Sequence, residues 1–258
     1  MEQCAQFRFY EELNDFLPRH QRKRDIPYIF TAHPAVKDSI EALGVPHTEV
    51  DLIIINGRSV GFACRLQACD RVAVYPVFES LDISPIVRLR PQPLRKTAFV
   101  LDVHLGTLAR LLRLLGFDAL YRNDFNDQEI IRLALASQRI ILTRDRRLLQ
   151  TKMVTHGYWL RSMDPEEQAC EVLRRFDLAG QVRLFQRCPL CNGVLRGVSK
   201  SKILAQLEPL TRRHYEEYQR CRDCGKVYWR GAHYPRLSCK LERILGGDRA
   251  ARKTTLFP

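Results

Sequence analysis

Two Cys-x-x-Cys pairs constrain this chain of 258 residues more than any other feature of its sequence. The pairs are Cys188 with Cys191 and Cys221 with Cys224, and 29 residues separate them. Each pair can place two thiolates on one tetrahedral ion, so that four sulfurs close the shell of a structural Zn²⁺ site. The spacing therefore predicts a zinc ribbon, and a redox pair or unpaired thiols are the alternatives.

The total number of cysteines indicates the cellular compartment of the protein. The chain has nine cysteines, and its first residues lack the basic segment followed by an apolar segment that marks a secretory signal. An odd count without such a signal favours metal ligation over a disulfide framework. No apolar run approaches the roughly 18 residues of a membrane span. We therefore expect a cytoplasmic protein without a membrane partner.

The positive charge of the chain is concentrated at one end. The formal net charge is +13, and residues 181–258 hold 17 Lys and Arg against 6 Asp and Glu. Such asymmetry is typical of modules that bind polyanions, and a basic surface that only aids solubility is the alternative. Because the charge coincides with the cysteine pairs, we expect this module to bind nucleic acid.

Aromatic and basic residues alternate around the second cysteine pair, which suits stacking on unpaired bases. We expect Arg230 and His233 to contact RNA, and Trp229 to belong to the small apolar core of the ribbon.

The first 80 residues carry the pattern of a small α+β domain. Asn56-Gly57 is a strong hairpin signal. The expected order is strand, strand, helix, strand, hairpin and strand, which is the order of a β-grasp fold. The predicted elements are Ala5–Tyr10, Tyr28–Thr31, Ala35–Leu43, Val50–Ile55 and Val72–Val77.

The middle of the chain follows a proline-containing segment, residues 81–97, with the composition of a linker. Beyond it, strands alternate with helices, which predicts α/β winding around a parallel sheet. Asp102 follows the apolar strand Ala98–Leu101, and Asp145 follows the strand Arg139–Thr143. Sites in such sheets gather at the carboxyl ends of the strands.

Carboxylates in this region could hold Mg²⁺ or Mn²⁺ for phosphodiester hydrolysis, because these ions prefer oxygen ligands. Each of them also has a structural explanation. A strand-terminal Asp often caps a helix, and Glu129 forms a capping-box pattern with Asn126. The candidates are Asp102, Asp127, Glu129 and Asp145, with Asp124 behind them.

Arginines surround the same strand ends and can clamp phosphate. The candidates are Arg110, Arg113, Arg144 and Arg146, and salt bridges to nearby carboxylates are the alternative role.

Several long stretches resemble the Mut7-C family. They are Val100–Asp102, Leu105–Asp118, Ile141–Leu149, Cys188–Gly193 and Val227–Tyr234. The resemblance implies a PIN-like RNase fold, with Asp102 and Asp145 at the family's acidic positions and the Asp127–Glu129 region matching more loosely.

The N-terminal part is similar to the ubiquitin-like domain found ahead of Mut7-C domains. The stretches Ser39–Val50, Ile55–Gly57 and Asp70–Pro76 carry this similarity, which extends to small sulfur carriers. Those carriers act through a C-terminal Gly-Gly, which is missing at the end of this domain, so sulfur transfer is not expected. Protein docking and a structural cap remain as its roles.

The chain is thus expected to combine α/β and α+β domains: a ubiquitin-like β-grasp domain (1–80), a linker (81–97), a PIN-like nuclease domain (98–180) and a basic zinc-ribbon module (181–258). The predicted function is metal-dependent hydrolysis of RNA. A non-catalytic RNA-binding adaptor with a degenerate PIN-like fold is the alternative.

Overall fold

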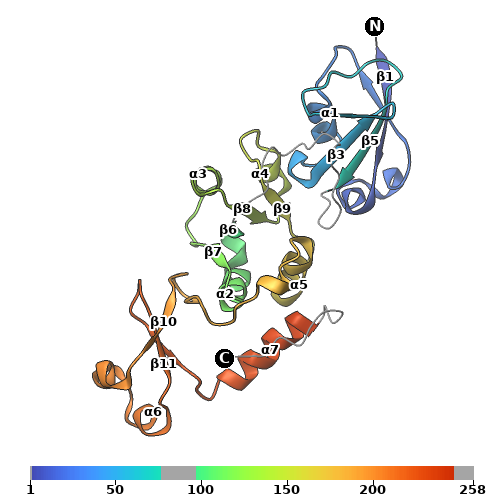
Figure 1. The fold of residues 1–258 in the computed structure, drawn as a ribbon. Helices are drawn as coiled ribbons and strands as arrows, with labels where there is room; N and C mark the ends of the chain where they lie inside the picture. Colours follow the sequence, from blue (N-terminus) through green and yellow to red (C-terminus); the bar gives the residue numbers. More distant parts are fainter. Residues whose placement is uncertain (1, 77–96, 247–258) are drawn as a thin grey trace. The chain divides into compact units, whose positions relative to one another are not determined.

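The computed structural model describes residues 2–76 and 97–246 (Figure 1). The chain forms two compact units. The first unit comprises Met1–Lys96 and Ala134–Trp159, and the second comprises Thr97–Leu133 and Leu160–Pro258. Apart from Thr97, the predicted linker lies outside the described residues. The domain boundaries expected from the sequence stay predictions.

A five-stranded mixed sheet forms the N-terminal part of the first unit, in the order β2-β1-β5-β3-β4. Strand β1 pairs parallel with β5, and the other pairs are antiparallel. Helix α1 buries Val36 and Ile40 in a core that includes Phe7 and Ile53. This arrangement is the predicted β-grasp. Its elements are β1 (Gln3–Phe9), β2 (Ile26–Phe30), α1 (Val36–Ala42), β3 (Val50–Ile55), β4 (Arg58–Val60), β5 (Arg71–Pro76) and the 3-10 helices η1 (Glu11–Phe16), η2 (Arg19–Gln21) and η3 (His47–Glu49).

The predicted hairpin is confirmed at Asn56-Gly57. Ile55 pairs with Arg58 across the turn. The φ angles of Asn56 and Gly57 are 50° and 81°, so both residues adopt the left-handed conformation of a type I′ turn. Asparagine and glycine tolerate this conformation better than other residues do, which is why this dipeptide sets the strand register.

The remainder of the first unit comes from the middle of the chain. Strand β8 (Ile140–Thr143) is buried along its whole length and pairs parallel with β9 (Gly157–Trp159). Helix α4 (Arg146–Gln150) connects them and buries Leu148 and Leu149.

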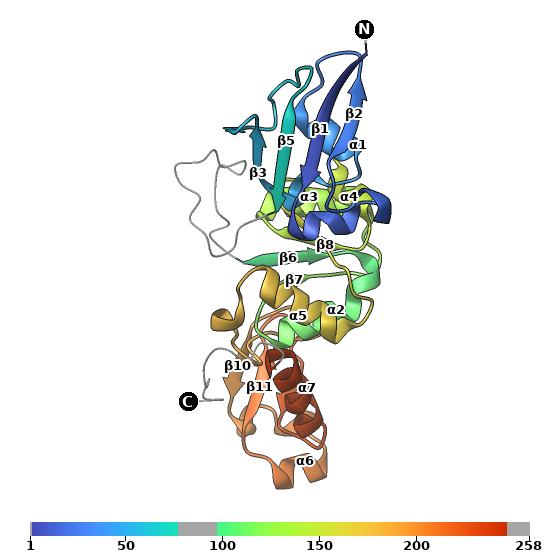
Figure 2. The same ribbon diagram turned by 90° about the vertical axis from the view of Figure 1, so that its right-hand side faces the viewer.

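The second unit opens with β6 (Ala98–Leu101), which is fully buried and pairs parallel with β7 (Asp118–Leu120). Helix α2 (Gly106–Leu114) follows η4 (Val103–Leu105) and packs beside α5 (Pro165–Arg175) (Figure 2). Asp164 caps α5 by accepting hydrogen bonds from the backbone N–H groups of Glu166 and Glu167. Helix α3 (Asp127–Ser137) begins in this unit.

The basic C-terminal module also belongs to the second unit. Its three strands form the antiparallel sheet β10-β11-β12, and Ile203, Leu207 and Tyr218 make a small core beside it. The structure thus confirms the predicted fold class of β-grasp, parallel α/β and ribbon parts. The elements of this module are η5 (Ala179–Gln181), β10 (Leu195–Val198), η6 (Lys200–Lys202), η7 (Leu204–Gln206), α6 (Pro209–His214), β11 (Tyr218–Cys221), β12 (Val227–Trp229) and α7 (Tyr234–Gly246).

Candidate functional site

The four predicted cysteines form one cluster. Their sulfur atoms all lie within 4.8 Å of one another. Cys188 Sγ is 3.7 Å from Cys224 Sγ, and Cys191 Sγ is 3.4 Å from Cys221 Sγ. A tetrahedral Zn²⁺ site with Zn–S bonds of about 2.3 Å has sulfur atoms roughly 3.8 Å apart. The cluster therefore fits a single metal ion with four sulfur ligands.

Tight turns shape each half of the cluster. The N–H of Asn192 donates to the carbonyl of Cys188, and the N–H of Gly225 donates to the carbonyl of Cys221. Asn192 and Gly225 have φ angles of 71° and 74°. A side chain at Gly193 would place its Cβ 2.7 Å from Cys221 Sγ. The Asn-Gly and Gly residues after the cysteine pairs thus allow the four sulfurs to approach.

The local environment shifts the pKa values of two of the four thiols in opposite directions. Burial raises the pKa of Cys188, but hydrogen bonds from Tyr228 and from the backbone of Cys191 and Leu190 outweigh it, and the resulting pKa is about 7. Burial raises the pKa of Cys191 to about 12. Four ionised thiolates at this distance require a compensating cation, and a metal ion deprotonates the thiols that coordinate it.

The predicted carboxylates of the second unit lie at the ends of two elements, β6 and α3. Asp102 follows β6, and its Oδ1 accepts a hydrogen bond of 2.6 Å from the N–H of Val103. Asp127 begins α3 and is exposed. The N–H of Glu129 donates to Asn126 Oδ1 at 2.9 Å, which is the cap expected from the sequence. Within the described part of the second unit, these three carboxylates do not form a group close enough to share one ion.

Asp145 lies in the first unit, directly after β8. It is exposed and is the N-cap of α4, and its Oδ1 accepts a hydrogen bond of 2.8 Å from the N–H of Arg147. Its own N–H donates to Thr143 Oγ1 at 2.8 Å. The catalytic roles of all four carboxylates stay predictions.

A groove of about 960 Å³ runs along the C-terminal module. Arg230 and His233 line it and are exposed, and their contact with RNA stays a prediction. Trp229 also lines it and is 40% exposed, so the expectation that it belongs to the ribbon core is wrong; Tyr228 packs beside the cysteines instead. The aromatic residues of the groove are Phe185, Tyr215, Tyr218, Tyr228, Trp229 and Tyr234.

A family model described as the Mut7-C RNAse domain matches residues 97–241, which is more than half of the chain. The chain belongs to the Mut7-C family. A second family model, described as Mut7-C ubiquitin, matches residues 2–82 and agrees with the β-grasp sheet. Searches of curated proteins and of solved structures each gave no match. Among the described residues of this Mut7-C protein, no helix has the length and apolar character needed to cross a membrane.

The Mut7-C match spans both the cysteines and Arg113, and the structure gives Arg113 a different role from the predicted one. Arg113 is only 3% exposed. Its guanidinium donates to the carbonyls of Ala119, Pro189 and Leu190 at 2.8, 3.1 and 2.9 Å. The last two carbonyls lie between Cys188 and Cys191. Arg113 therefore supports the first cysteine turn from α2, and we leave it out of the RNA-contacting set.

A polar network around Asn192 completes this support. Asn192 Oδ1 accepts from the N–H of Ala119 at 3.1 Å, and Asn192 Nδ2 donates to Asp118 Oδ1 at 2.8 Å. Arg187 pairs with the other oxygen of Asp118 at 3.2 Å. The sequence contains no local signal for this network, because its members lie about seventy positions apart.

The other three predicted arginines differ from one another. Arg146 is half-buried in the first unit, and its guanidinium donates to the carbonyls of Phe16 and Asp15. Arg110 is exposed on α2, three positions before Arg113. Arg144 is half-buried in the first unit, and its carbonyl accepts a hydrogen bond from Trp159 Nε1 at 3.1 Å.

Proposed function

We propose that this Mut7-C protein is a metal-dependent ribonuclease that hydrolyses RNA held by its basic ribbon module. The observation that carries the proposal is the match to the Mut7-C RNAse domain, which spans all four candidate carboxylates and all four clustered cysteines.

The carboxylates would supply the oxygen ligands for Mg²⁺ or Mn²⁺. When bound, such an ion activates water and stabilises the leaving oxygen. The helix caps made by Asp102 and Asp145 each place one hydrogen bond on Oδ1, and a carboxylate has about four lone-pair sites, so capping and ion binding are compatible. The proposed ligands are Asp102, Asp127, Glu129 and Asp145.

The ribbon module would bind the substrate. Its groove combines the exposed ring of Trp229 and several half-buried aromatic rings with basic side chains, and every nucleobase can stack on an accessible ring. Two glutamates of the groove are each paired with a cation: Glu216 with Lys200 at 2.5 Å and Glu217 with Arg230 at 3.7 Å. The proposed RNA contacts are Arg110, Arg144, Arg230 and His233. A zinc ion on the four cysteines would have a structural role. Its ligands must be reduced thiolates, and the reducing cytoplasm keeps cysteines in this state.

A non-catalytic RNA-binding adaptor is the second candidate. The observation that favours it is the capping role of Asp102 and Asp145, since each carboxylate already has a structural function. In this case the ribbon would bind RNA without cleavage.

The deciding experiment incubates the full-length protein with pooled cellular RNA in Mg²⁺, in Mn²⁺ and in chelator. Cleavage that depends on the divalent ion supports the nuclease. RNA binding that is never followed by cleavage in either metal would replace it with the adaptor.

A further inference from the structure

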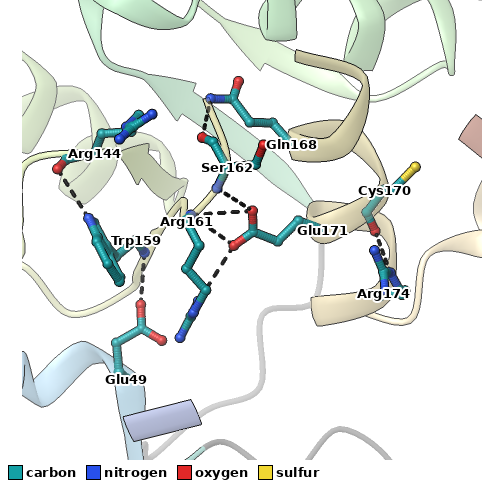
Figure 3. A network of polar contacts seen from close by, with 9 residues as sticks. All are labelled: Glu49, Arg144, Trp159, Arg161, Ser162, Gln168, Cys170, Glu171 and Arg174. Atoms are coloured by element: carbon teal, nitrogen blue, oxygen red, sulfur yellow. Dashed lines mark hydrogen bonds and ion pairs between the residues drawn. The ribbon is translucent and has the colours of Figure 1, made fainter. Parts of the chain in front are cut away.

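Both residues that flank Asp145 have long-range partners. Arg144 is bound by Trp159, which packs against the β-grasp core, and Arg146 is bound by the β-grasp part itself. The carbonyl of Arg144 accepts from Trp159 Nε1 at 3.1 Å (Figure 3). The guanidinium of Arg146 donates to the carbonyl of Phe16 at 3.1 Å and to that of Asp15 at 3.4 Å. The chain is therefore held immediately before the candidate catalytic carboxylate by a backbone carbonyl and immediately after it by a side chain.

Trp159 connects these contacts. Its backbone N–H donates to Glu49 Oε1 at 2.8 Å, and the Glu49 side chain comes from η3 of the β-grasp part (Figure 3). The indole packs against the β-grasp core and lies 4.9 Å from the ring of Phe16. The guanidinium of Arg146 lies 4.0 Å above the same indole, within the range of a cation–π contact.

A further contact fastens the segment after α4. His47, also on η3, is buried, and its Nε2 donates to the carbonyl of Val154 at 2.7 Å. Its Nδ1 lies 2.6 Å from Glu41 Oε1 on α1. The β-grasp part thus contacts the first residue of helix α4, Arg146, and the segment after it, at Val154, and Asp145 is the N-cap of this helix.

We propose that the β-grasp part positions the loop that carries Asp145 (residues 143–147) in the nuclease, with Trp159 and Arg146 as positioning residues. The inference rests on the proposed function. It gives the ubiquitin-like domain a role inside the enzyme, distinct from docking another protein. Catalytic groups must be held closely, since a displacement of about 1 Å can reduce a rate roughly a hundredfold.

The test uses full-length Trp159→Phe, which keeps an aromatic ring but removes the Nε1–H donor, and Arg146→Ala, which removes both carbonyl contacts. We expect kcat on RNA to fall about tenfold or more in each variant, with little change in KM. Arg146→Lys, which keeps one charged donor, should recover part of the rate.

The control is Arg22→Ala. Arg22 also donates to carbonyls near η1, those of Leu17 at 3.0 Å and Asp15 at 3.5 Å, but it does not contact the neighbours of Asp145. It should leave kcat unchanged. A Trp159→Phe or Arg146→Ala protein with wild-type kcat would overturn the positioning role, and so would an equal loss in Arg22→Ala.

Hydrogen exchange separates this inference from the proposed function. The amides of Asp145 and Arg147 donate to side-chain acceptors within this loop. They should exchange about fivefold faster or more in Trp159→Phe and Arg146→Ala than in wild type or Arg22→Ala. If wild type cleaves no RNA, the nuclease proposal fails while this exchange pattern still tests the positioning. Unchanged exchange in both variants would refute it.

Discussion

The four-cysteine cluster and the candidate carboxylates differ in how the chain assembles them. The four sulfurs come from two short turns of one module, and the structure places them within reach of a single ion. Asp102 and Asp145 follow separate strands, Asp127 and Glu129 lie in the first turn of α3, and the four carboxylates belong to both compact units. A site built from two local turns can be inferred from spacing alone, whereas a site built from distant elements depends on tertiary positioning. The variants below test this contrast.

The largest effect is expected at the cysteines. Purified protein should carry about one zinc ion, and Cys191→Ser should lose it. The ribbon should then unfold locally, because apparent metal-binding energies of about 10–16 kcal/mol contribute directly to folding in such modules. Metal analysis and hydrogen exchange measure the two changes. Cys239→Ser is the control, since Cys239 is exposed and outside the cluster. Wild-type protein without zinc, prepared under reducing conditions without chelator, would contradict the site.

The next largest effect is expected at the strand-terminal carboxylates. Asp102→Asn and Asp145→Asn should each reduce cleavage by about a hundredfold or more, because an anionic ligand is lost. Folding should change little, since Asn caps helices about as well as Asp. The double variant should be scarcely worse than either single variant. Initial cleavage rates at saturating metal provide the measurement.

Asp164→Asn is the matched control for this experiment. Asp164 caps α5 as Asp145 caps α4, but it is not proposed as a metal ligand. If Asp145→Asn cleaves at the rate of Asp164→Asn, then Asp145 is only a helix cap. The carboxylates would then lose a member of the proposed site, while the cysteine cluster would be unaffected.

A smaller effect separates two arginines of the same helix. Arg113→Ala should lower the free energy of unfolding of the second unit by about 3 kcal/mol, because carbonyls of the first cysteine turn lose a charged donor. Arg110→Ala should change it by less than about 0.5 kcal/mol, as exposed positions do, and should weaken RNA binding. Urea unfolding and RNA titration measure the two quantities. Equal stability of the two variants would show that the buried arginine does not support the cysteine turn.

The smallest effect concerns the groove. Trp229→Ala should weaken the binding of a single-stranded RNA about tenfold, since stacking of one base contributes about 1–3 kcal/mol. Binding of duplex RNA should change less, because its bases are already stacked. Leu204→Ala is the control: Leu204 is exposed in the same module but does not line the groove. Equal loss for duplex and single-stranded RNA would exclude base stacking at Trp229.

Local patterns predicted much of the fold. Val50–Ile55 and Ala98–Leu101 were expected as strands with the bounds that the structure has, because apolar β-branched runs and the Asn56-Gly57 turn act over a few residues. The cysteine cluster was predicted for the same reason. Helix α7 was not predicted, although it begins within the stretch that resembles the Mut7-C family.

Local sequence patterns do not predict which side chains are buried or which distant residues they contact. Arg110 and Arg113 are indistinguishable in sequence, yet one is exposed and the other supports a turn more than seventy residues away. Trp229 was expected in a core and is exposed, whereas Trp159, which carried no motif, binds the neighbours of Asp145. Spacing along the chain specifies contacts that form within one turn. Which side of a helix or strand faces another element depends on packing between segments that are distant in sequence.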